Sequence, residues 1–252
     1  MGEMGPTHGI LVGCDHTQEW LLSPWHSSLR KHHPDLPVAF GDLGMSDEGR
    51  AWCERYGRLI PAAQIPPLPR PVSQEPGWPY AGEHWVQKGH QSSPLSVLFR
   101  KPLLMKQSPF TRTVYLDLDC QILGNLSPLF SMRLGPAKLG LRKSTNNYEM
   151  RSIKTGNTMR IPSYNSGVVV FDKNSRLLDF WVFLLAREIH AFSTDDRLLA
   201  FAMACYNMRS AEFPLEYNWL YHWGQNPRAV IFHWIGEPGK VAFRMGFAES
   251  GF

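Results

Sequence analysis

The sequence is poor in cysteine, and the few cysteines that it has form no Cys-x-x-Cys pair. This spacing argues against the common structural zinc modules and gives no basis for a disulfide framework. We therefore expect free thiols and a cytoplasmic location, where thiols stay reduced. The four cysteines are Cys14, Cys53, Cys120 and Cys205.

Long apolar runs are also missing. No stretch reaches the roughly 18 to 20 uninterrupted apolar residues that a membrane-spanning helix needs. The segment from Met1 to Pro6 has no apolar core of a secretory signal. Pro6 also stands where a myristoylation signal has Ser or Thr. We expect no transmembrane segment, and peripheral contact with a membrane stays open.

The sequence also lacks a large excess of charge of one sign. The formal net charge is only +4, and the basic residues are spread along the chain. A nucleic-acid partner is therefore not expected. One polar segment gathers several basic residues, and we expect a solvated loop there, with an anionic ligand or a membrane surface as the alternative. Its members are Arg142, Lys143, Arg151, Lys154 and Arg160.

The sequence does contain an alternation of strand and helix signals. Such an alternation predicts an α/β fold with a mixed, mostly parallel sheet flanked by helices. In sheets of this kind ligands bind at the carboxyl ends of the strands. Apolar runs predict strands at 9–14, 37–40, 113–119, 137–141, 166–172 and 229–234, and helical spacing predicts helices at 19–32, 46–56 and 176–189.

Residues 61–94 interrupt this alternation. They carry 8 of the 20 prolines, so we expect a long loop without regular structure. The aromatic residues Trp78, Tyr80 and Trp85 lie within it. They offer either a stacking surface for a sugar ring or anchors that hold the loop against the body of the protein.

Two carboxylates, Asp117 and Asp119, end the apolar run that begins at Thr113. Side chains of a strand alternate between its faces, so this spacing predicts that both point the same way. Mg²⁺ and Mn²⁺ take carboxylate ligands and leave positions open for phosphate. The pair therefore indicates metal-assisted chemistry on a phosphorylated ligand, whereas an acidic strand end facing solvent is the simpler alternative.

Further polar motifs flank this pair in a fixed order. Arg100 and Lys101 begin a buried helical segment that leads into the motif strand, and either cation could approach a diphosphate. After the pair come Asn165 before the apolar run Val168–Phe171, the acidic residues Asp195 and Asp196, and the segment His233-Trp-Ile-Gly-Glu-Pro-Gly-Lys240. A stretch from Phe213 to Asn218 precedes the last of these.

This ordered set resembles the retaining glycosyltransferases of family 8, which have the GT-A fold. The resemblance implies one glycosyltransferase domain over 1–252, with a nucleotide-binding part at about 9–119 and an acceptor-side part at about 120–252. It implies that Asp117, Asp119 and His233 bind Mn²⁺ or Mg²⁺ on the diphosphate of a sugar nucleotide. The imidazole favours manganese.

The remaining roles also follow from the resemblance. Asp15 matches the position that reads the nucleotide base, and Arg100, with Lys101 beside it, the cation that contacts the donor. Lys240 follows Gly236 by one residue more than is usual in the family, and we expect a flexible Pro-Gly turn to bring it to the diphosphate. Asn165, Asp195 and Asp196 match positions beside the reacting carbon, although the family usually has Gln in place of Asp196.

We therefore expect transfer of a hexose, glucose or galactose, from a UDP-sugar to a carbohydrate, lipid or protein acceptor. Two other functions fit parts of the pattern. A haloacid-dehalogenase-like phosphatase also has an Asp-x-Asp motif, but normally on its first strand. The departures at Asp196 and Lys240 leave room for a non-catalytic domain that binds nucleotide sugars or carbohydrates. Structural roles are possible too, with Thr194 capping a helix and His233 packed in a core.

Overall fold

A computed structural model of the chain describes residues 7–61, 85–87, 97–152 and 154–249. Its main element is an eight-stranded sheet with the strand order β3-β2-β1-β5-β8-β7-β4, in which β9 pairs with β7. The first half of this order is parallel. It consists of β1 (His8–Cys14), β2 (Val38–Asp42), β3 (Arg58–Ile60) and β5 (Arg112–Leu116).

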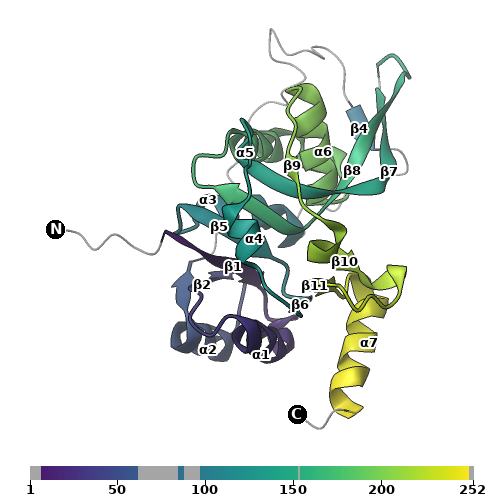
Figure 1. Cartoon of the computed structure of the whole chain (residues 1–252). Helices are drawn as coiled ribbons and strands as arrows, with labels where there is room; N and C mark the ends of the chain where they lie inside the picture. The colour runs from purple at the N-terminus through teal and green to yellow at the C-terminus, as the bar shows by residue number, and fades with distance from the viewer. Residues whose placement is uncertain (1–6, 62–84, 88–96, 153, 250–252) are drawn as a thin grey trace, which may run out of the picture.

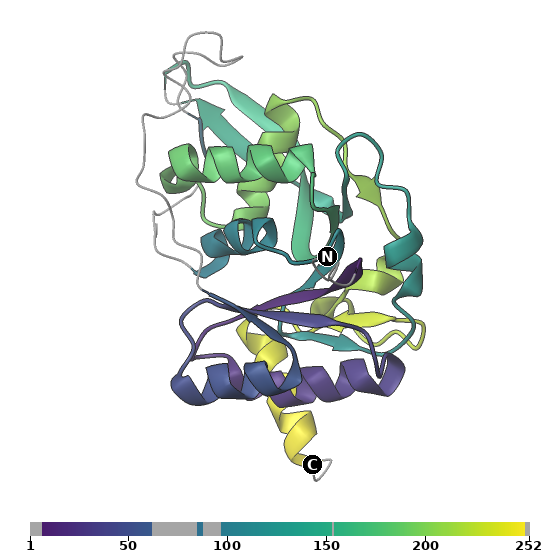
Figure 2. The same cartoon turned by 90° about the vertical axis from the view of Figure 1, so that its left-hand side faces the viewer.

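Helices cover both faces of this sheet because its central strands are apolar throughout. On one face lie α1 (Leu22–His32) and α2 (Asp47–Tyr56), and on the other α3 (Lys101–Lys106), α5 (Arg176–Glu188) and α6 (Asp195–Cys205) (Figures 1 and 2). The predicted start of α2 is confirmed, since the Ser46 hydroxyl accepts a hydrogen bond from the Gly49 N–H.

The second half of the sheet is antiparallel and is dominated by a long hairpin of β7 (Leu139–Ser152) and β8 (Thr158–Asp172). The expectation of a solvated loop for the basic segment from Arg142 to Arg160 is therefore wrong for the residues within these strands. Buried side chains recur at every second position, at Met150 and Ser152 and at Ile161 and Ser163. This period of two is the strand pattern, but polar residues take half of these buried positions.

Short strands border the hairpin. β4 (Trp85–Gln87) pairs antiparallel with β7, and β9 (Ala211–Glu212) pairs parallel with it. β4 falls inside the segment 61–94, so the expectation of no regular element there is wrong at these three residues. Trp78, Tyr80 and most of that segment lie outside the described residues.

A second sheet of three strands joins the carboxyl-terminal part of the chain to the centre. It pairs β10 (Trp219–Leu220) with β11 (Ile231–His233), and β11 with β6 (Cys120–Ile122). The helices α4 (Ser127–Ser131) and α7 (Gly236–Glu249) follow β6 and β11. 3₁₀ turns span Glu19–Leu21, Val97–Arg100, Ile189–Ala191, Leu215–Asn218 and Tyr221–Trp223.

The Asp-x-Asp motif lies in the turn between β5 and β6. Strand β5 ends at Leu116, and the N–H of Cys120 donates to the carbonyl oxygen of Asp117 at 3.0 Å, which closes the turn. The strand alternation therefore does not extend to these residues, but both carboxylates still face one cavity, as the sequence predicts. Their side chains take different partners, as described below.

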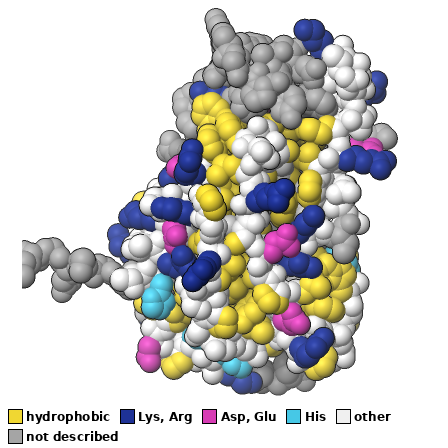
Figure 3. Space-filling view, turned by 45° about the horizontal axis from the view of Figure 1, so that its top comes forward, with side chains coloured by type: hydrophobic (Ala, Val, Ile, Leu, Met, Phe, Trp, Pro, Cys, Tyr) yellow, Lys and Arg dark blue, Asp and Glu magenta, His cyan; other side chains and the backbone are white. Residues whose placement is uncertain are grey.

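The surface agrees with the modest net charge. On the described part of the face drawn in Figure 3, Lys and Arg side chains are spaced among hydrophobic and acidic ones. All four cysteines are buried and unpaired. Among the described helices, none has the length and apolar character that crossing a membrane requires.

Candidate active site

A cavity of about 340 Å³ lies at the carboxyl ends of β1 and β5, and we refer to it as the first cavity. Its wall brings together segments that are distant in the sequence: the loop after β1, the start of α3, the β5–β6 turn, the middle of β8, and the starts of α6 and α7. The predicted site residues in this wall are Asp15, Lys101, Asp117, Asp119, Asn165, Asp195, Asp196, His233 and Lys240.

Arg100 is the predicted site residue that is not part of this wall. Its Nη1 donates to the carbonyl oxygen of Leu43 at 2.7 Å. Arg100 ends a 3₁₀ turn and Lys101 begins α3, and adjacent helical residues point about 100° apart, so the two side chains take different directions. Lys101 lines the cavity and Arg100 does not. The sequence alone could not distinguish between these two neighbouring cations.

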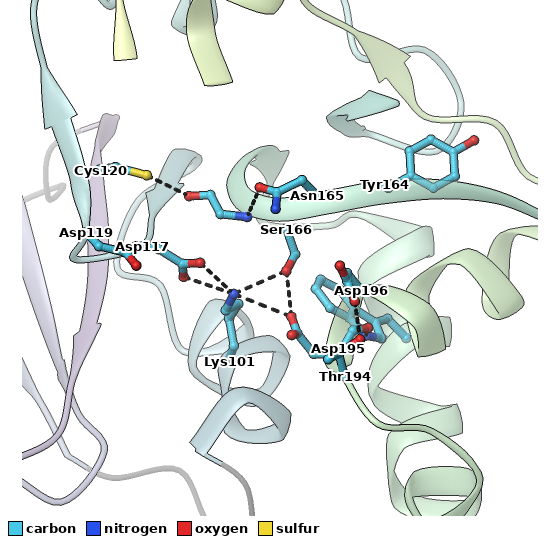
Figure 4. A network of polar contacts seen from close by, with 12 residues as sticks. Lys101, Asp117, Asp119, Cys120, Tyr164, Asn165, Ser166, Thr194, Asp195 and Asp196 are labelled. Carbon is cyan, nitrogen blue, oxygen red and sulfur yellow. Dashed lines mark hydrogen bonds and ion pairs between the residues drawn. The ribbon is translucent and has the colours of Figure 1, made fainter. Parts of the chain in front are cut away.

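Lys101 is the centre of a buried polar network (Figure 4). Its Nζ lies 2.9 Å from Oδ1 and 3.0 Å from Oδ2 of Asp117, 3.2 Å from Oγ of Ser166 and 3.5 Å from Oδ2 of Asp195. Burial by itself would lower the pKa of Lys101, but Asp117 and Asp195 raise it well above its usual value. A buried ammonium ion is thus held between two carboxylates.

Asp195 begins α6 and is almost completely buried. Burial, together with Asp196 and Asp117, raises its pKa to about 6 against the opposing effect of Lys101. The Ser166 hydroxyl donates to its Oδ2 at 2.8 Å. Thr194 takes the N-cap position as expected, but its hydroxyl donates to Asp196 rather than accepting from a backbone N–H of the helix.

Asp119 faces a different set of partners from Asp117. Its Oδ1 lies 3.2 Å from Nε2 of His233, and its Oδ2 lies 3.4 Å from Nζ of Lys240. Burial would raise the pKa of Asp119, but His233, Lys240 and Lys101 lower it to about 2. Lys240 belongs to the first turns of α7, so the expected flexible Pro-Gly turn is wrong: these residues are helical.

A chain of hydrogen bonds fixes the proton position on His233. The N–H of Gly167 donates to Oδ1 of Asn165 at 3.0 Å, so this oxygen also accepts from Nδ2 of Asn218 at 2.8 Å. Oδ1 of Asn218 therefore faces Nδ1 of His233, at 3.0 Å, and Nδ1 must be the donor. In the form of the ring that binds a metal, Nε2 therefore presents its lone pair to the carboxylates.

This arrangement fits a metal ion. A bare imidazole nitrogen and a carboxylate oxygen at 3.2 Å need a cation or a proton between them. Asp117 lies close by, with its Oδ2 4.0 Å from Nε2 of His233. Two carboxylates and an imidazole held by an amide are a donor set that suits Mn²⁺ and, less well, Mg²⁺.

Cys120 lies within the same group of potential ligands, since its sulfur and the ligand atoms of Asp119 and His233 are within 4.8 Å of one another. Its thiol donates to the carbonyl oxygen of Gly167 at 3.6 Å. Burial raises the pKa of Cys120 well above its usual value. Thiolate suits softer metals, whereas carboxylate donors suit Mn²⁺ and Mg²⁺, so we do not assign Cys120 to the donor set.

Comparisons with known proteins bear on the fold. No protein-family model and no curated protein matches the sequence. Galactosyltransferase LgtC, solved with donor and acceptor sugar analogs, superposes with a TM-score of 0.57 at 15% identity, over 90% of this chain and 87% of that one. Mouse xyloside xylosyltransferase 1 gives 0.54 at 14% identity, over 90% and 97%. Glycosyltransferase GlyE of Streptococcus pneumoniae gives 0.58 at 15%, over 92% and 55%.

The chain has the fold of these glycosyltransferases. The expected GT-A-type α/β fold, with a mostly parallel central sheet flanked by helices, is thus confirmed. At such low sequence identity the likeness concerns the fold, and the roles of single residues depend on the geometry of this chain. The division into parts at about 9–119 and 120–252 stays a prediction.

Asp15 lies at the end of the first cavity formed by the loop after β1. It is half-buried, and its Oδ1 accepts from the N–H of Thr17 at 3.1 Å and from the Thr17 hydroxyl at 2.7 Å. The second carboxylate oxygen is not used in these bonds. Reading a nucleotide base with it stays a prediction.

Sequence reasoning missed two residues that the site depends on. Asn218 ends a stretch similar to a family motif that assigns it no role, yet it is fully buried and holds both His233 and Asn165. Ser166 accepts from Lys101 and donates to Asp195. The motif stretch includes Asn218 but does not show its partners, and no local pattern marks Ser166, because the partners of both residues come from distant segments.

Proposed function

We propose that this chain is a metal-dependent, retaining glycosyltransferase that moves a hexose from a UDP-sugar to an acceptor hydroxyl. The observation that carries the proposal is the pairing of Asp119 with both His233 and Lys240 at one cavity, 3.2 and 3.4 Å away. Carboxylate and imidazole suit the metal, and the lysine suits the diphosphate. The similarity of the fold to that of glycosyltransferases supports the same function.

Asp117, Asp119 and His233 would hold the ion. When bound, Mn²⁺ supplies positive charge for the diphosphate that departs from the sugar. Lys240 adds a second cation, and the start of α7 at Gly236 lines the same cavity. Backbone N–H groups at a helix start are free to donate to phosphate oxygens. Lys101, whose Nζ lies 2.9 Å from Oδ1 of Asp117, offsets the negative charge of that carboxylate.

The transfer step needs no protonated leaving group. The bond between the anomeric carbon and the phosphate oxygen breaks with its electron pair going to phosphate, and the acceptor oxygen forms the new bond from the same face. The departing phosphate oxygen takes the proton of the acceptor hydroxyl. Asp195 and Asp196 stabilise the positive charge that develops on the sugar, and the side-chain amide of Asn165 orients the acceptor.

The test is a thermal-shift panel of nucleotide sugars with and without Mn²⁺. We expect UDP-glucose or UDP-galactose to raise the melting temperature only with the metal. The Asp119→Asn variant should lose this shift, whereas Asp179→Asn, at an exposed ion pair with Lys106, should keep it. A metal-independent shift, or an equal one in Asp119→Asn, would contradict the metal site.

Two assays separate the alternatives. Release of UDP and a product with the donor's anomeric configuration, seen by proton NMR, would support the retaining transferase. Donor binding without hydrolysis or transfer would favour a non-catalytic domain, and cleavage of p-nitrophenyl phosphate would favour a phosphatase. We propose a cytoplasmic location on the basis of the unpaired thiols.

A further inference from the structure

A second cavity, of about 210 Å³, adjoins the first. The two share Asn165 and Asp196, so a group bound in one can meet a group bound in the other at this junction. In the view of Figure 4, Tyr164 and Asp196 lie on the far side of Asn165 from Asp119. If the first cavity holds a donor, as proposed above, the second has the position of an acceptor site.

Basic side chains predominate among the charged residues of the second cavity. Arg142 and Lys143 contribute from β7, whereas Asp196 is the acidic residue in the described wall. Asp196 already accepts hydrogen bonds from the hydroxyls of Tyr148 and Thr194. The basic residues do not line the first cavity, so a diphosphate bound there would not take up their charge.

Arg142 has hydrogen-bonding capacity that the described residues do not use. Its Nε is buried without a hydrogen-bond partner among them. Its ion pair with Glu212 is 3.7 Å long, beyond hydrogen-bond distance. A mostly buried guanidinium with unused donors calls for a partner, and its planar donors match the oxygens of a carboxylate or a phosphate.

The position of Arg142 places this partner near the junction. Arg142 is the register partner of Asn165 across β7 and β8. The register shifts just before Arg142 and again after Lys143, and such irregularities often redirect side chains at sites. Lys143, which is exposed, follows at the outer edge of the second cavity and also borders a third cavity of about 410 Å³.

We propose that the second cavity binds the acceptor, and that the acceptor is a sugar carrying a carboxylate or a phosphate group. Arg142 and Lys143 bind the anionic group. Tyr164 and Trp223 supply aromatic surface for the sugar ring. Asn165 and Asp196 meet the reacting hydroxyl at the junction. The acceptor role rests on the proposed function, while the preference for an anionic sugar rests on the second cavity alone.

The test compares methyl glycosides of glucose, glucuronic acid and glucose 6-phosphate, and their galactose counterparts, by calorimetry or saturation-transfer NMR. The measurements are made with and without UDP and Mn²⁺. At least one anionic glycoside should bind about tenfold more tightly than its neutral counterpart, and the difference should shrink as salt is added. The carboxylate and phosphate arms identify which anion is preferred. Equal binding of neutral and anionic glycosides would overturn the proposal.

Substitutions test which residues cause the preference for anionic glycosides. Arg142→Gln should abolish it, and Lys143→Gln, at an exposed position that the fold tolerates, should reduce it. Arg160→Gln is the matched control, because Arg160 lies on the same hairpin but is paired with Glu149 and lines none of the three cavities. A preference that survives in the Arg142→Gln, Lys143→Gln double variant would also overturn the proposal.

The thermal shift with UDP and Mn²⁺ distinguishes the two proposals. A chain that discriminates between anionic and neutral sugars but does not bind UDP would refute the glycosyltransferase and keep the anionic sugar site. A chain that binds UDP with metal but does not discriminate would keep the transferase and refute the anionic acceptor. The same shift shows whether Arg142→Gln is folded.

Discussion

Gly167 lies directly against His233. A Cβ atom on Gly167 would come within 2.1 Å of Cε1 and 2.6 Å of Nδ1 of the imidazole ring. The ring is buried, so it has little room to move away. Gly167 also donates the N–H that fixes Asn165 and accepts from the Cys120 thiol. A residue without a side chain therefore sets the position of the candidate metal ligand.

Gly167→Ala is expected to displace His233 from Asn218 and from Asp119. Overpacking of a buried site typically costs about 1 to 3 kcal/mol of unfolding free energy. Mn²⁺ affinity should fall by about tenfold or more, because the ligand no longer points at the carboxylates. Urea denaturation measures the first effect, and titration followed by the electron paramagnetic resonance of free Mn²⁺ measures the second.

Gly246→Ala is the matched control. Gly246 lies in α7, and a Cβ there would meet no heavy atom within 4 Å. Alanine in a helix is favoured over glycine by roughly 0.5 to 1 kcal/mol, so this variant should be equally or more stable and should bind Mn²⁺ normally. Unchanged Mn²⁺ affinity in Gly167→Ala would contradict the ligand role of His233.

Asn218→Leu should weaken Mn²⁺ binding by about 10- to 100-fold, the usual effect of removing a residue that orients a metal ligand. Leucine has a similar size but neither accepts from Nδ1 of His233 nor donates to Asn165. Asn218→Asp keeps the acceptor and should retain more affinity than Asn218→Leu. Calorimetric titration measures the Mn²⁺ affinity of both variants. Equal losses of affinity would refute the role of Asn218 in orienting His233.

The sequence predicted the parallel half of the fold better than the antiparallel half. Strands β1, β2 and β5 are apolar and bounded by loops, so their positions could be read directly from the apolar runs. The outer part of the β7–β8 hairpin, at 142–152 and 158–165, is mostly polar and only partly buried, and its pairing depends on residues of the partner strand. A local pattern does not contain that information.

The candidate site, too, could be predicted only in part from the sequence. Motif order indicated Asp119, His233 and Lys240 correctly as neighbours of one cavity, although Lys240 reaches it from a helix instead of a flexible turn. The motif could not show that Asp117 pairs with Lys101 while Asp119 pairs with His233, because the turn after β5 breaks the strand alternation. Arg100 and Lys101 are adjacent cations whose side chains leave the backbone in different directions, so the motif could not show which of them lines the cavity.

Lys101→Met should destabilise the protein strongly. The substitution keeps the length of the side chain but leaves Asp117 and Asp195 together without their shared cation. Breaking a buried ion pair in this way costs about 3 to 5 kcal/mol. Lys106→Met on the same helix is the control, since its pair with Asp179 is partly exposed and should contribute less than about 1 kcal/mol. Urea denaturation at neutral pH compares them, and equal losses would contradict the role of Lys101.

Asp195 should make stability depend on pH between about 4 and 6. In the folded chain burial raises the pKa of Asp195 to about 6, whereas an unfolded aspartate titrates near about 4. Within this window the native state holds a proton that the unfolded state releases, so stability falls as the pH rises. The contribution of this group is fully present below about pH 4 and is lost as the pH rises through about 6.

Removing the carboxyl group should remove this dependence. A shift of about 2 pKa units corresponds to about 3 kcal/mol, so Asp195→Asn should flatten the decline in unfolding free energy between pH 4 and 6 by roughly that amount. Asp179→Asn, at an exposed position, should leave the profile unchanged. Urea denaturation at several pH values measures both variants. A profile of Asp195→Asn that is parallel to that of the unmodified chain would show that the buried carboxyl group does not hold this proton.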